Sequence, residues 1–277
     1  MKTITINNVD ISNDLPFVFI GGPCVIESED HPLFICEKIK NICDKLKIQY
    51  IFKSSFDKAN RTNFKGKRGV GIDKGLKILE KVKNKFNVPI LTDVHLPDQC
   101  KVVAEVTDIL QIPAFLSRQT DLLEAAGKTG KIINVKKAQF MAPNDMENVI
   151  SKITSTGNDK ILLCDRGTCF GYNNLVSDFR ALPIMTKTEY PVVFDATHSI
   201  QLPSANGTCS GGERDFAAIL ARAAIAVGVA GIFMEVHDEP EKALCDGPNM
   251  IRLSDLEQVL LELLALDKIS KQYKRRI

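Results

Sequence analysis

The chain has 277 residues, of which 44% are hydrophobic and 25% charged, and its net charge at pH 7 is +2. This length allows one large domain or two small ones, and a charge so near zero gives no argument for nucleic-acid binding. Eight cysteines occur without a C-x-x-C pair or regular spacing. That pattern argues against a disulfide framework or a zinc ribbon and fits a reducing cytosol. The first ten residues lack the apolar core of a signal peptide, so we expect a cytoplasmic protein.

In chain order, residues 1–14 come first, and their TITINNVDI stretch could form a small hairpin turning at Asn7 and Asn8. Short β-rich runs then alternate with longer helical patterns. The predicted strands are FVFIGGP (17–23), YIFKSSF (50–56), PILTDVH (89–95), ILQIPAF (109–115), IINVKKA (132–138), ILLCDRG (161–167), PVVFDATH (191–198) and GIFMEVH (231–237). The clearest predicted helices are 33–46, 74–86, 145–154, 216–227 and 253–266.

This alternation predicts an α/β fold with a parallel sheet. Eight strand–helix units in about 250 residues match the number and length of a (β/α)8 TIM barrel. We therefore predict a single barrel domain over 1–277, in which the 1–14 extension could cap the barrel bottom. The apolar segment 217–234 contains Arg222, Gly228 and Gly231. We interpret it as a buried helix ending near Gly228 and a strand from Gly231, not as a membrane span.

Polar residues gather at the carboxyl ends of the predicted strands, where barrel active sites lie. Five cations lie on or just after the second, fifth and sixth strands: Lys53, Lys58, Arg61, Lys136 and Arg166. Each alone is more simply a solvated surface charge, but together they predict a mouth that binds more than one anionic group. The sequence has no P-loop motif, so nucleotide phosphates are not expected.

Barrel closure would also bring four potential metal ligands together. Cys24, His198 and Glu235 end the first, seventh and eighth strands, which become neighbours when the barrel closes, and Asp246 follows in a loop. A thiolate, an imidazole and two carboxylates suit a divalent transition metal. Taken singly, a cysteine at a strand tip is more often a packing residue, and a lone histidine is more often structural. The rival ligands that the residues leave open are His95, His237 and Cys245.

Several motifs are long and specific: GPCVIES (22–28), FKSSFDKANRT (52–62), RGVG (68–71), LTDVH (91–95), QIPAFLSRQTDLL (111–123), INVKKAQF (133–140), CDRGTCFGYNNL (164–175), FDATH (194–198), SGGERD (210–215) and CDGP (245–248). They resemble the 3-deoxy-D-manno-octulosonate 8-phosphate synthases, also called 2-dehydro-3-deoxyphosphooctonate aldolases. The resemblance runs from about Phe17 to Leu264. The sister 3-deoxy-D-arabino-heptulosonate 7-phosphate synthases resemble KPRTS where this chain has KANRT (58–62), so that motif separates the two groups.

The resemblance implies an enzyme that condenses phosphoenolpyruvate with D-arabinose 5-phosphate and water, releasing phosphate in a step of lipopolysaccharide precursor biosynthesis. The implied phosphoenolpyruvate ligands are Lys58, Lys136, Arg166 and Gln111, supported by Lys53. The implied sugar-phosphate ligands are Asn60 and Arg61, with Asp93 near the sugar hydroxyls. The residues implied in catalysis are Lys58, Asp93, Lys136 and His198.

The resemblance also bears on the metal. One branch of the family uses a divalent metal, and the other has asparagine in place of the metal-binding cysteine. With Cys24, His198, Glu235 and Asp246, this chain resembles the metal-dependent branch, whose ion could be Zn²⁺, Fe²⁺, Mn²⁺ or Co²⁺. The family further implies a homotetramer, and we expect neither nucleic-acid nor membrane partners.

Three alternatives stay open at this point. The seven-carbon synthase shares the chemistry and is disfavoured by KANRT. A Schiff-base aldolase would use a strand lysine such as Lys136 to form an imine. A non-catalytic barrel would use the cations to bind a sugar phosphate but would catalyse no reaction.

Overall fold

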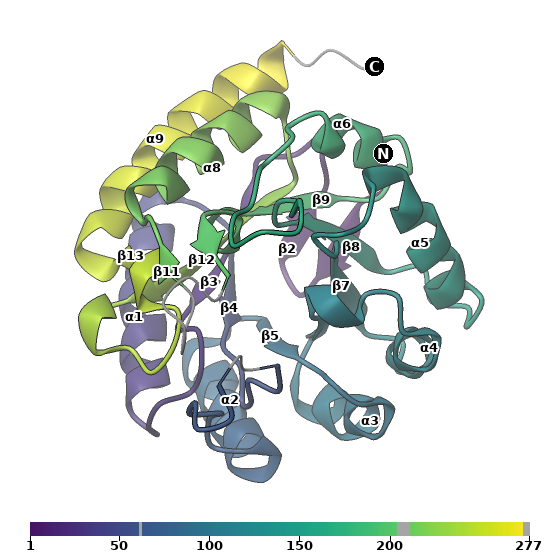
Figure 1. Ribbon diagram of the computed structural model, residues 1–277. Coiled ribbons are helices and arrows are strands. Elements are labelled where there is room, and N and C mark those ends of the chain that lie inside the picture. The colour runs from purple at the N-terminus through teal and green to yellow at the C-terminus, as the bar shows by residue number, and fades with distance from the viewer. Residues whose placement is uncertain (61–62, 204–210, 274–277) are drawn as a thin grey trace.

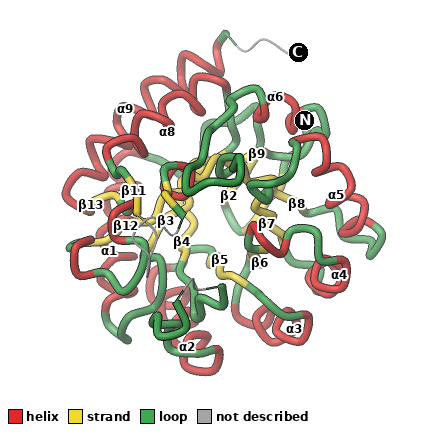
Figure 2. Tube along the Cα trace, viewed as in Figure 1, coloured by secondary structure: helices red, strands yellow, loops and turns green. Residues whose placement is uncertain are grey.

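The computed structural model describes residues 1–60, 63–203 and 211–273. Eight parallel strands form a closed ring inside a layer of helices (Figures 1 and 2). The ring consists of β3 (Val18–Gly22), β4 (Tyr50–Lys53), β5 (Ile90–Asp93), β6 (Ile109–Ile112), β7 (Ile132–Lys136), β8 (Ile161–Asp165), β9 (Val192–Asp195) and β12 (Gly231–His237). Because β12 pairs with both β9 and β3, the ring closes, and the predicted (β/α)8 barrel is confirmed.

Helices cover the outside of the ring. They are α1 (His31–Leu46), α2 (Ile72–Phe86), α3 (Pro97–Val106), α4 (Thr120–Lys128), α5 (Met146–Thr154), α6 (Ala181–Thr186), α8 (Asp215–Val227) and α9 (Leu253–Gln272). Helix α8 ends at a left-handed Gly228 and β12 begins at Gly231, as predicted for this apolar segment. In the described part of the chain, no helix is long and apolar enough to cross a membrane.

The predicted N-terminal hairpin is confirmed as β1 (Ile4–Ile6) and β2 (Val9–Ile11), which pair antiparallel. Asn7 makes the turn with a positive φ of 50°. Ile4, Val9 and Ile11 are buried in the same cluster as the inward-facing residues that begin the barrel strands, such as Val18. The hairpin therefore closes the bottom of the barrel, at the end opposite the polar residues.

Short elements follow the strands at the carboxyl end: α7 (Ala196–Ser199), β10 (Gln201–Leu202), β11 (Gly211–Gly212), β13 (Ile251–Arg252), and the 3-10 turns η1 (Ala114–Leu116), η2 (Pro143–Asp145), η3 (Pro240–Lys242) and η4 (Gly247–Asn249). One of them corrects a prediction, because His198 lies in α7 and not at the end of a strand. The reason is local: Asp195 caps α7, and its Oδ1 accepts a hydrogen bond from the His198 backbone N–H at 2.9 Å.

Gly22 permits the closest backbone approach beside the site. A Cβ at this position would lie 2.1 Å from the backbone oxygen of Lys53. We expect Gly22→Ala to push β3 away from β4 and to lower the free energy of unfolding by about 3 kcal/mol, the upper part of the range for overpacked positions. Urea denaturation would measure this. Gly71→Ala is the matched control, since Gly71 also has a positive φ but has nothing within 4 Å of its Cβ position. Equal losses in the two variants would contradict the steric explanation.

Candidate active site

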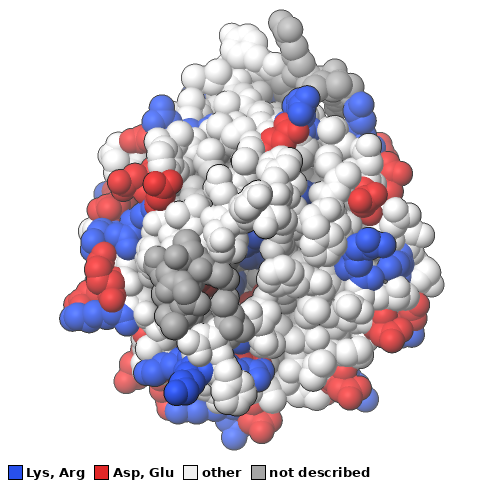
Figure 3. Space-filling view, viewed as in Figure 1, with Lys and Arg blue, Asp and Glu red and all other residues white. Residues whose placement is uncertain are grey.

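Ten of the predicted site residues lie together at the carboxyl end of the barrel. They are Cys24, Lys53, Lys58, Asp93, Gln111, Lys136, Arg166, His198, Glu235 and Asp246. In Figure 3, blue atoms of cationic side chains are visible deep in a hollow near the middle of the face that Figure 1 presents. Inward-facing strand positions place five of them, because alternate residues of a strand share a face. The segments that follow the strands carry the other five, namely Cys24, Lys58, Arg166, His198 and Asp246.

Lys136 and His198 are joined by a carboxylate that the sequence analysis did not single out, Asp195. Its Oδ2 lies 2.6 Å from Lys136 Nζ and 2.8 Å from His198 Nδ1. Burial opposes the charges on both Asp195 and Lys136, but their pairing prevails: the pKa of Asp195 is held well below its ordinary value by His198 and Lys136, and the pKa of Lys136 is raised by Asp195. Lys136 is therefore held as a cation over the ring of Phe233, 4.1 Å from its centroid.

Glu235 is the second buried anchor. Its Oε1 accepts a hydrogen bond from Lys53 Nζ at 2.6 Å and lies 3.8 Å from Lys58 Nζ and 3.6 Å from His198 Nε2. Burial alone would raise the pKa of Glu235, but Lys53, His198 and Lys58 hold it well below its ordinary value. Its other oxygen, Oε2, is buried without a hydrogen-bond partner among the described residues. A buried, ionised oxygen of this kind is available to a ligand or metal ion.

Asp93 belongs to a chain of polar side chains across β4 to β7. Its Oδ1 accepts from Gln111 Nε2 at 2.6 Å, and Gln111 Oε1 accepts from Asn134 Nδ2 at 2.8 Å. Ser55 Oγ donates to the other oxygen of Asp93. Despite burial, the cations Lys58, Lys53 and Lys136 hold the pKa of Asp93 well below its usual range. Asp93 therefore accepts hydrogen bonds as a carboxylate.

The four predicted metal ligands converge through Asp246. One ligand atom each from His198, Glu235 and Asp246 lies within 4.8 Å of the others, and the same holds for Cys24, Cys245 and Asp246. Cys24 Sγ lies 3.2 Å from Asp246 Oδ2 and 2.6 Å from Cys245 Sγ. Burial and then Cys245 raise the pKa of the Cys24 thiol well above its ordinary value, against the opposing effect of Lys58. The donor set and the free Oε2 of Glu235 fit a divalent transition ion, which would stabilise the thiolate.

Arg166 connects to this group through a residue that the sequence analysis also missed, Gln201 on β10. Arg166 Nη2 donates to Gln201 Oε1 at 2.9 Å, and Gln201 Nε2 donates to Asp246 Oδ1 at 3.1 Å. Burial lowers the pKa of Arg166, but a guanidinium remains charged at neutral pH. Asp195 was detectable as the polar end of the FDATH run, whereas nothing in the sequence pattern pointed to Gln201.

Other predicted residues lie apart. Asn60 is exposed and borders a separate hollow of about 280 Å³ with Asp57 and the rival ligand His95. His237 lies beside Glu27 and Asp238, not with the four predicted metal ligands. Arg61 lies outside the described residues.

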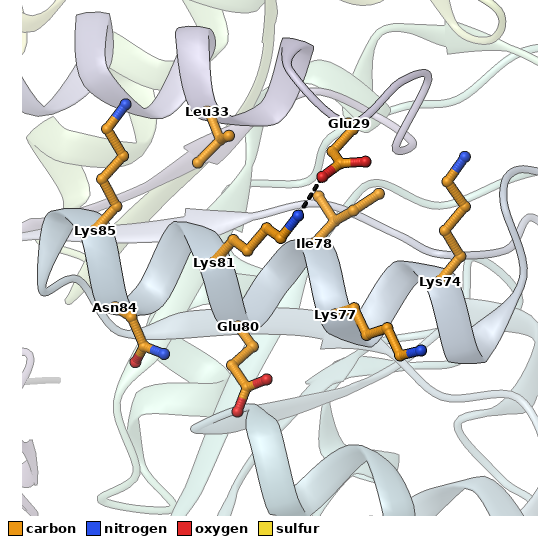
Figure 4. A pocket seen from close by; sticks show the side chains of 9 residues that line it. All are labelled: Glu29, Leu33, Lys74, Lys77, Ile78, Glu80, Lys81, Asn84 and Lys85. Atoms are coloured by element: carbon orange, nitrogen blue, oxygen red, sulfur yellow. Dashed lines mark hydrogen bonds and ion pairs between the residues drawn. The ribbon is translucent and has the colours of Figure 1, made fainter.

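Another groove lies outside the barrel, between α1 and α2. Figure 4 shows its basic rim, which includes Lys74, Lys77 and Lys85, and an ion pair between Lys81 and Glu29. None of the predicted site residues that the structure describes lines it. Exposed helix lysines of this kind are ordinary solvated charges.

The fold and this site define a (β/α)8 barrel with a charged, metal-compatible centre at the carboxyl ends of its strands. The family model described as the DAHP synthetase I family matches residues 2–272. The 2-dehydro-3-deoxyphosphooctonate aldolase of Rickettsia typhi is 59% identical over 271 residues, which cover 98% of this chain and 99% of the relative. Proteins of the same name from Rickettsia conorii and Rickettsia canadensis are 59% and 57% identical with the same coverage. The chain therefore belongs to the DAHP synthetase I family, among the 2-dehydro-3-deoxyphosphooctonate aldolases.

Proposed function

We propose that this protein is a 3-deoxy-D-manno-octulosonate 8-phosphate synthase that condenses phosphoenolpyruvate with D-arabinose 5-phosphate and water and releases phosphate. The observation that carries the proposal is the joint presence of buried cations and a metal-compatible ligand set in one barrel mouth. Relatives that match nearly the whole chain are named for this activity.

In this proposal, phosphoenolpyruvate binds to Lys58, Lys136, Arg166 and Gln111, with Lys53 behind them. The described centre contains four cations, Lys53, Lys58, Lys136 and Arg166, and four carboxylates, Asp93, Asp195, Glu235 and Asp246. The cations are therefore compensated in the free protein. The positive charge of a divalent ion would further favour binding of phosphoenolpyruvate, which carries several negative charges.

Asn60 and Arg61 would hold the phosphate of the sugar, and Asp93 would accept hydrogen bonds from its hydroxyls. Asn60 follows β4 at the rim, next to the hollow that also contains Asp57. This division puts the two phosphates at different depths, so that the reacting carbons can meet between them.

Cys24, His198, Glu235 and Asp246 would hold the metal ion, which when bound would supply Lewis-acid polarisation of an oxygen ligand. The protein's own groups perform the rest. Carbon 3 of phosphoenolpyruvate attacks the sugar aldehyde, and water adds at carbon 2, where positive charge develops. Phosphate then leaves with its bridging oxygen. Lys58, Lys136 and Arg166 stabilise the anionic groups, while Asp195, 2.8 Å from His198 Nδ1, would orient that imidazole as a metal ligand.

The raised pKa of Lys136 disfavours the Schiff-base alternative. Imine formation needs a neutral amine, but Lys136 is held protonated by Asp195 at 2.6 Å. The lysine therefore serves as a charge.

Acceptor choice tests the proposal. Because KANRT occupies 58–62, we expect arabinose 5-phosphate to be used at least about 100-fold better than erythrose 4-phosphate, since a site that hydrogen-bonds a substrate hydroxyl strongly rejects an analogue without it. Steady-state kcat/KM values for the two sugars, measured by phosphate release, would decide it. A preference for the four-carbon sugar would assign the chain to the sister activity, and no turnover with either would favour a binding protein.

The same proposal includes a homotetramer in the cytoplasm, in lipopolysaccharide precursor synthesis. The described cysteines are free thiols, six of them buried, which fits a reducing compartment. Sedimentation analysis would give the oligomeric state directly.

A further inference from the structure

A second cluster of potential metal ligands lies at the end of β12. It shares no residue with the set Cys24, His198, Glu235 and Asp246. Glu27 follows β3, His31 begins α1 and His237 ends β12, three elements that lie side by side (Figure 1). One ligand atom of each residue lies within 4.8 Å of the other two. Two imidazoles and a carboxylate are a common ligand set for zinc and similar ions.

A fourth residue, Asp238, is hydrogen-bonded to His31 and lies close to His237. Its Oδ1 lies 3.0 Å from His31 Nε2 and 3.1 Å from His237 Nδ1. A carboxylate that binds the outer nitrogen of a metal-ligating histidine is the usual second partner in such sites. The rings lie against each other, with centroids 4.6 Å apart.

The remaining ring nitrogens lack hydrogen-bond partners. His31 Nδ1 and His237 Nε2 are both buried without one among the described residues, and His237 as a residue is only 4% exposed. Glu27 Oε1 lies 3.4 Å from His237 Nε2. Unsatisfied buried nitrogens of this kind are costly unless something binds them.

Hydrogen bonds alone, without a metal ion, would satisfy only part of this cluster. The Glu239 backbone N–H donates to His237 Nδ1 at 2.9 Å, which would place the ring proton on Nε2, facing Glu27. That tautomer satisfies His237 but leaves His31 Nδ1 without a partner. A proton on Nδ1 would replace the Glu239 contact and face Asp238 Oδ1, 3.1 Å away, and it would free the Nε2 lone pair for a metal.

We propose that Glu27, His31 and His237 bind a second divalent transition ion, such as Zn²⁺, with Asp238 as the outer partner of both histidines. The ion can enter from solvent, since the Asp238 side chain is 38% exposed and that of His31 is 15% exposed. Its role would be structural. Glu27 Oε1 also accepts a hydrogen bond from the Leu244 backbone N–H at 3.0 Å, immediately before Cys245 and Asp246. The ion would thus fasten the loop that carries Asp246 to β3 and α1.

Cobalt(II) titration of the metal-free full chain separates the two sites. A thiolate ligand such as Cys24 gives a sulfur-to-cobalt charge-transfer band, whereas the second cluster has no sulfur. We expect two Co²⁺ ions per wild-type chain, only one of them associated with that band. His31→Gln should bind one ion with the band unchanged. The matched control Glu29→Gln removes an exposed carboxylate two positions from Glu27 and should still bind two ions.

Cys24→Ser gives the complementary measurement and does not alter the second cluster. It should lose the charge-transfer band and still bind one ion, which added His31→Gln would remove. For each variant, elemental analysis gives the number of Co²⁺ ions bound per chain, and circular dichroism shows whether the chain is folded. Any of three results would overturn the proposal. The wild-type chain could bind only one ion, or the His31→Gln variant could still bind two. The third is a Cys24→Ser/His31→Gln variant that binds as many ions as Cys24→Ser alone.

Discussion

Chelation of the metal ion proposed at Cys24, His198, Glu235 and Asp246 should reduce turnover of phosphoenolpyruvate and arabinose 5-phosphate by at least about 100-fold, because Lewis-acid stabilisation is worth several kcal/mol. Zn²⁺, Mn²⁺, Co²⁺ or Fe²⁺ should each restore activity to a different degree, since a mixed sulfur, nitrogen and oxygen set does not select one ion sharply. The measurement is phosphate release after chelation and after each ion is added back, with metal content determined in parallel.

Variants of Cys24 test whether the loss of turnover on chelation comes from the predicted metal site. Cys24→Ser should weaken metal binding, because a hydroxyl is a poor substitute for a thiolate next to Asp246. Cys24→Asn should keep part of the activity without metal, because asparagine stands there in the other branch of the family. Cys100→Ser is the control, since it changes a buried thiol on the outer helix α3. A wild-type enzyme that stays fully active after complete metal removal would return Cys24 to a packing role.

The barrel was predictable because its strands and helices differ in period and length. Apolar β-rich runs of about seven residues separated by amphipathic segments predict a parallel sheet covered by helices, and eight such units match a closed barrel. The pattern missed α3, α4 and α6, which are 10, 9 and 6 residues long. Few turns make an apolar stripe harder to recognise, although α5, with 9 residues, was predicted. Packing against the barrel stabilises helices of this length.

The positions of the site residues were predictable for a related reason. Closure of the barrel makes β3 and β12 neighbours, so Cys24 and Glu235 had to approach each other. Charge pairing across strands was not predictable. The lysines were expected to face substrate anions, yet Lys136 is paired with Asp195 and Lys53 with Glu235. Period-two alternation assigns a side chain to a face but does not specify which residue of another strand it meets.

Lys136→Met should have the largest combined effect on binding and stability. Loss of a charge-assisted contact should weaken phosphoenolpyruvate binding by about 2–3 kcal/mol, roughly 30- to 150-fold. It also leaves Asp195 buried without its lysine partner, which should lower the free energy of unfolding by about 3–5 kcal/mol at pH 7. Calorimetric titration with phosphoenolpyruvate and urea denaturation measure the two effects.

Lys137→Met is the matched control, because the neighbouring Lys137 is also buried but pairs with Asp165, 3.3 Å away. It should lower stability and leave phosphoenolpyruvate affinity nearly unchanged. In a double-mutant cycle, Lys136→Met/Asp195→Asn should recover stability but not affinity. Recovery of affinity as well would show that Lys136 serves only as the counterion of Asp195.

The pH dependence of stability gives an independent check with a definite sign. In the wild-type protein the pKa of Asp195 is depressed, so its pairing stabilises the fold above the ordinary aspartate pKa and is lost as the pH falls. Lys136→Met removes much of that contribution. The stability difference between wild type and variant should therefore be largest at neutral pH and shrink as the pH falls below about 4. A difference that stays constant from pH 7 to pH 3 would mean that lost packing against Phe233, and not the ion pair, accounts for the destabilisation.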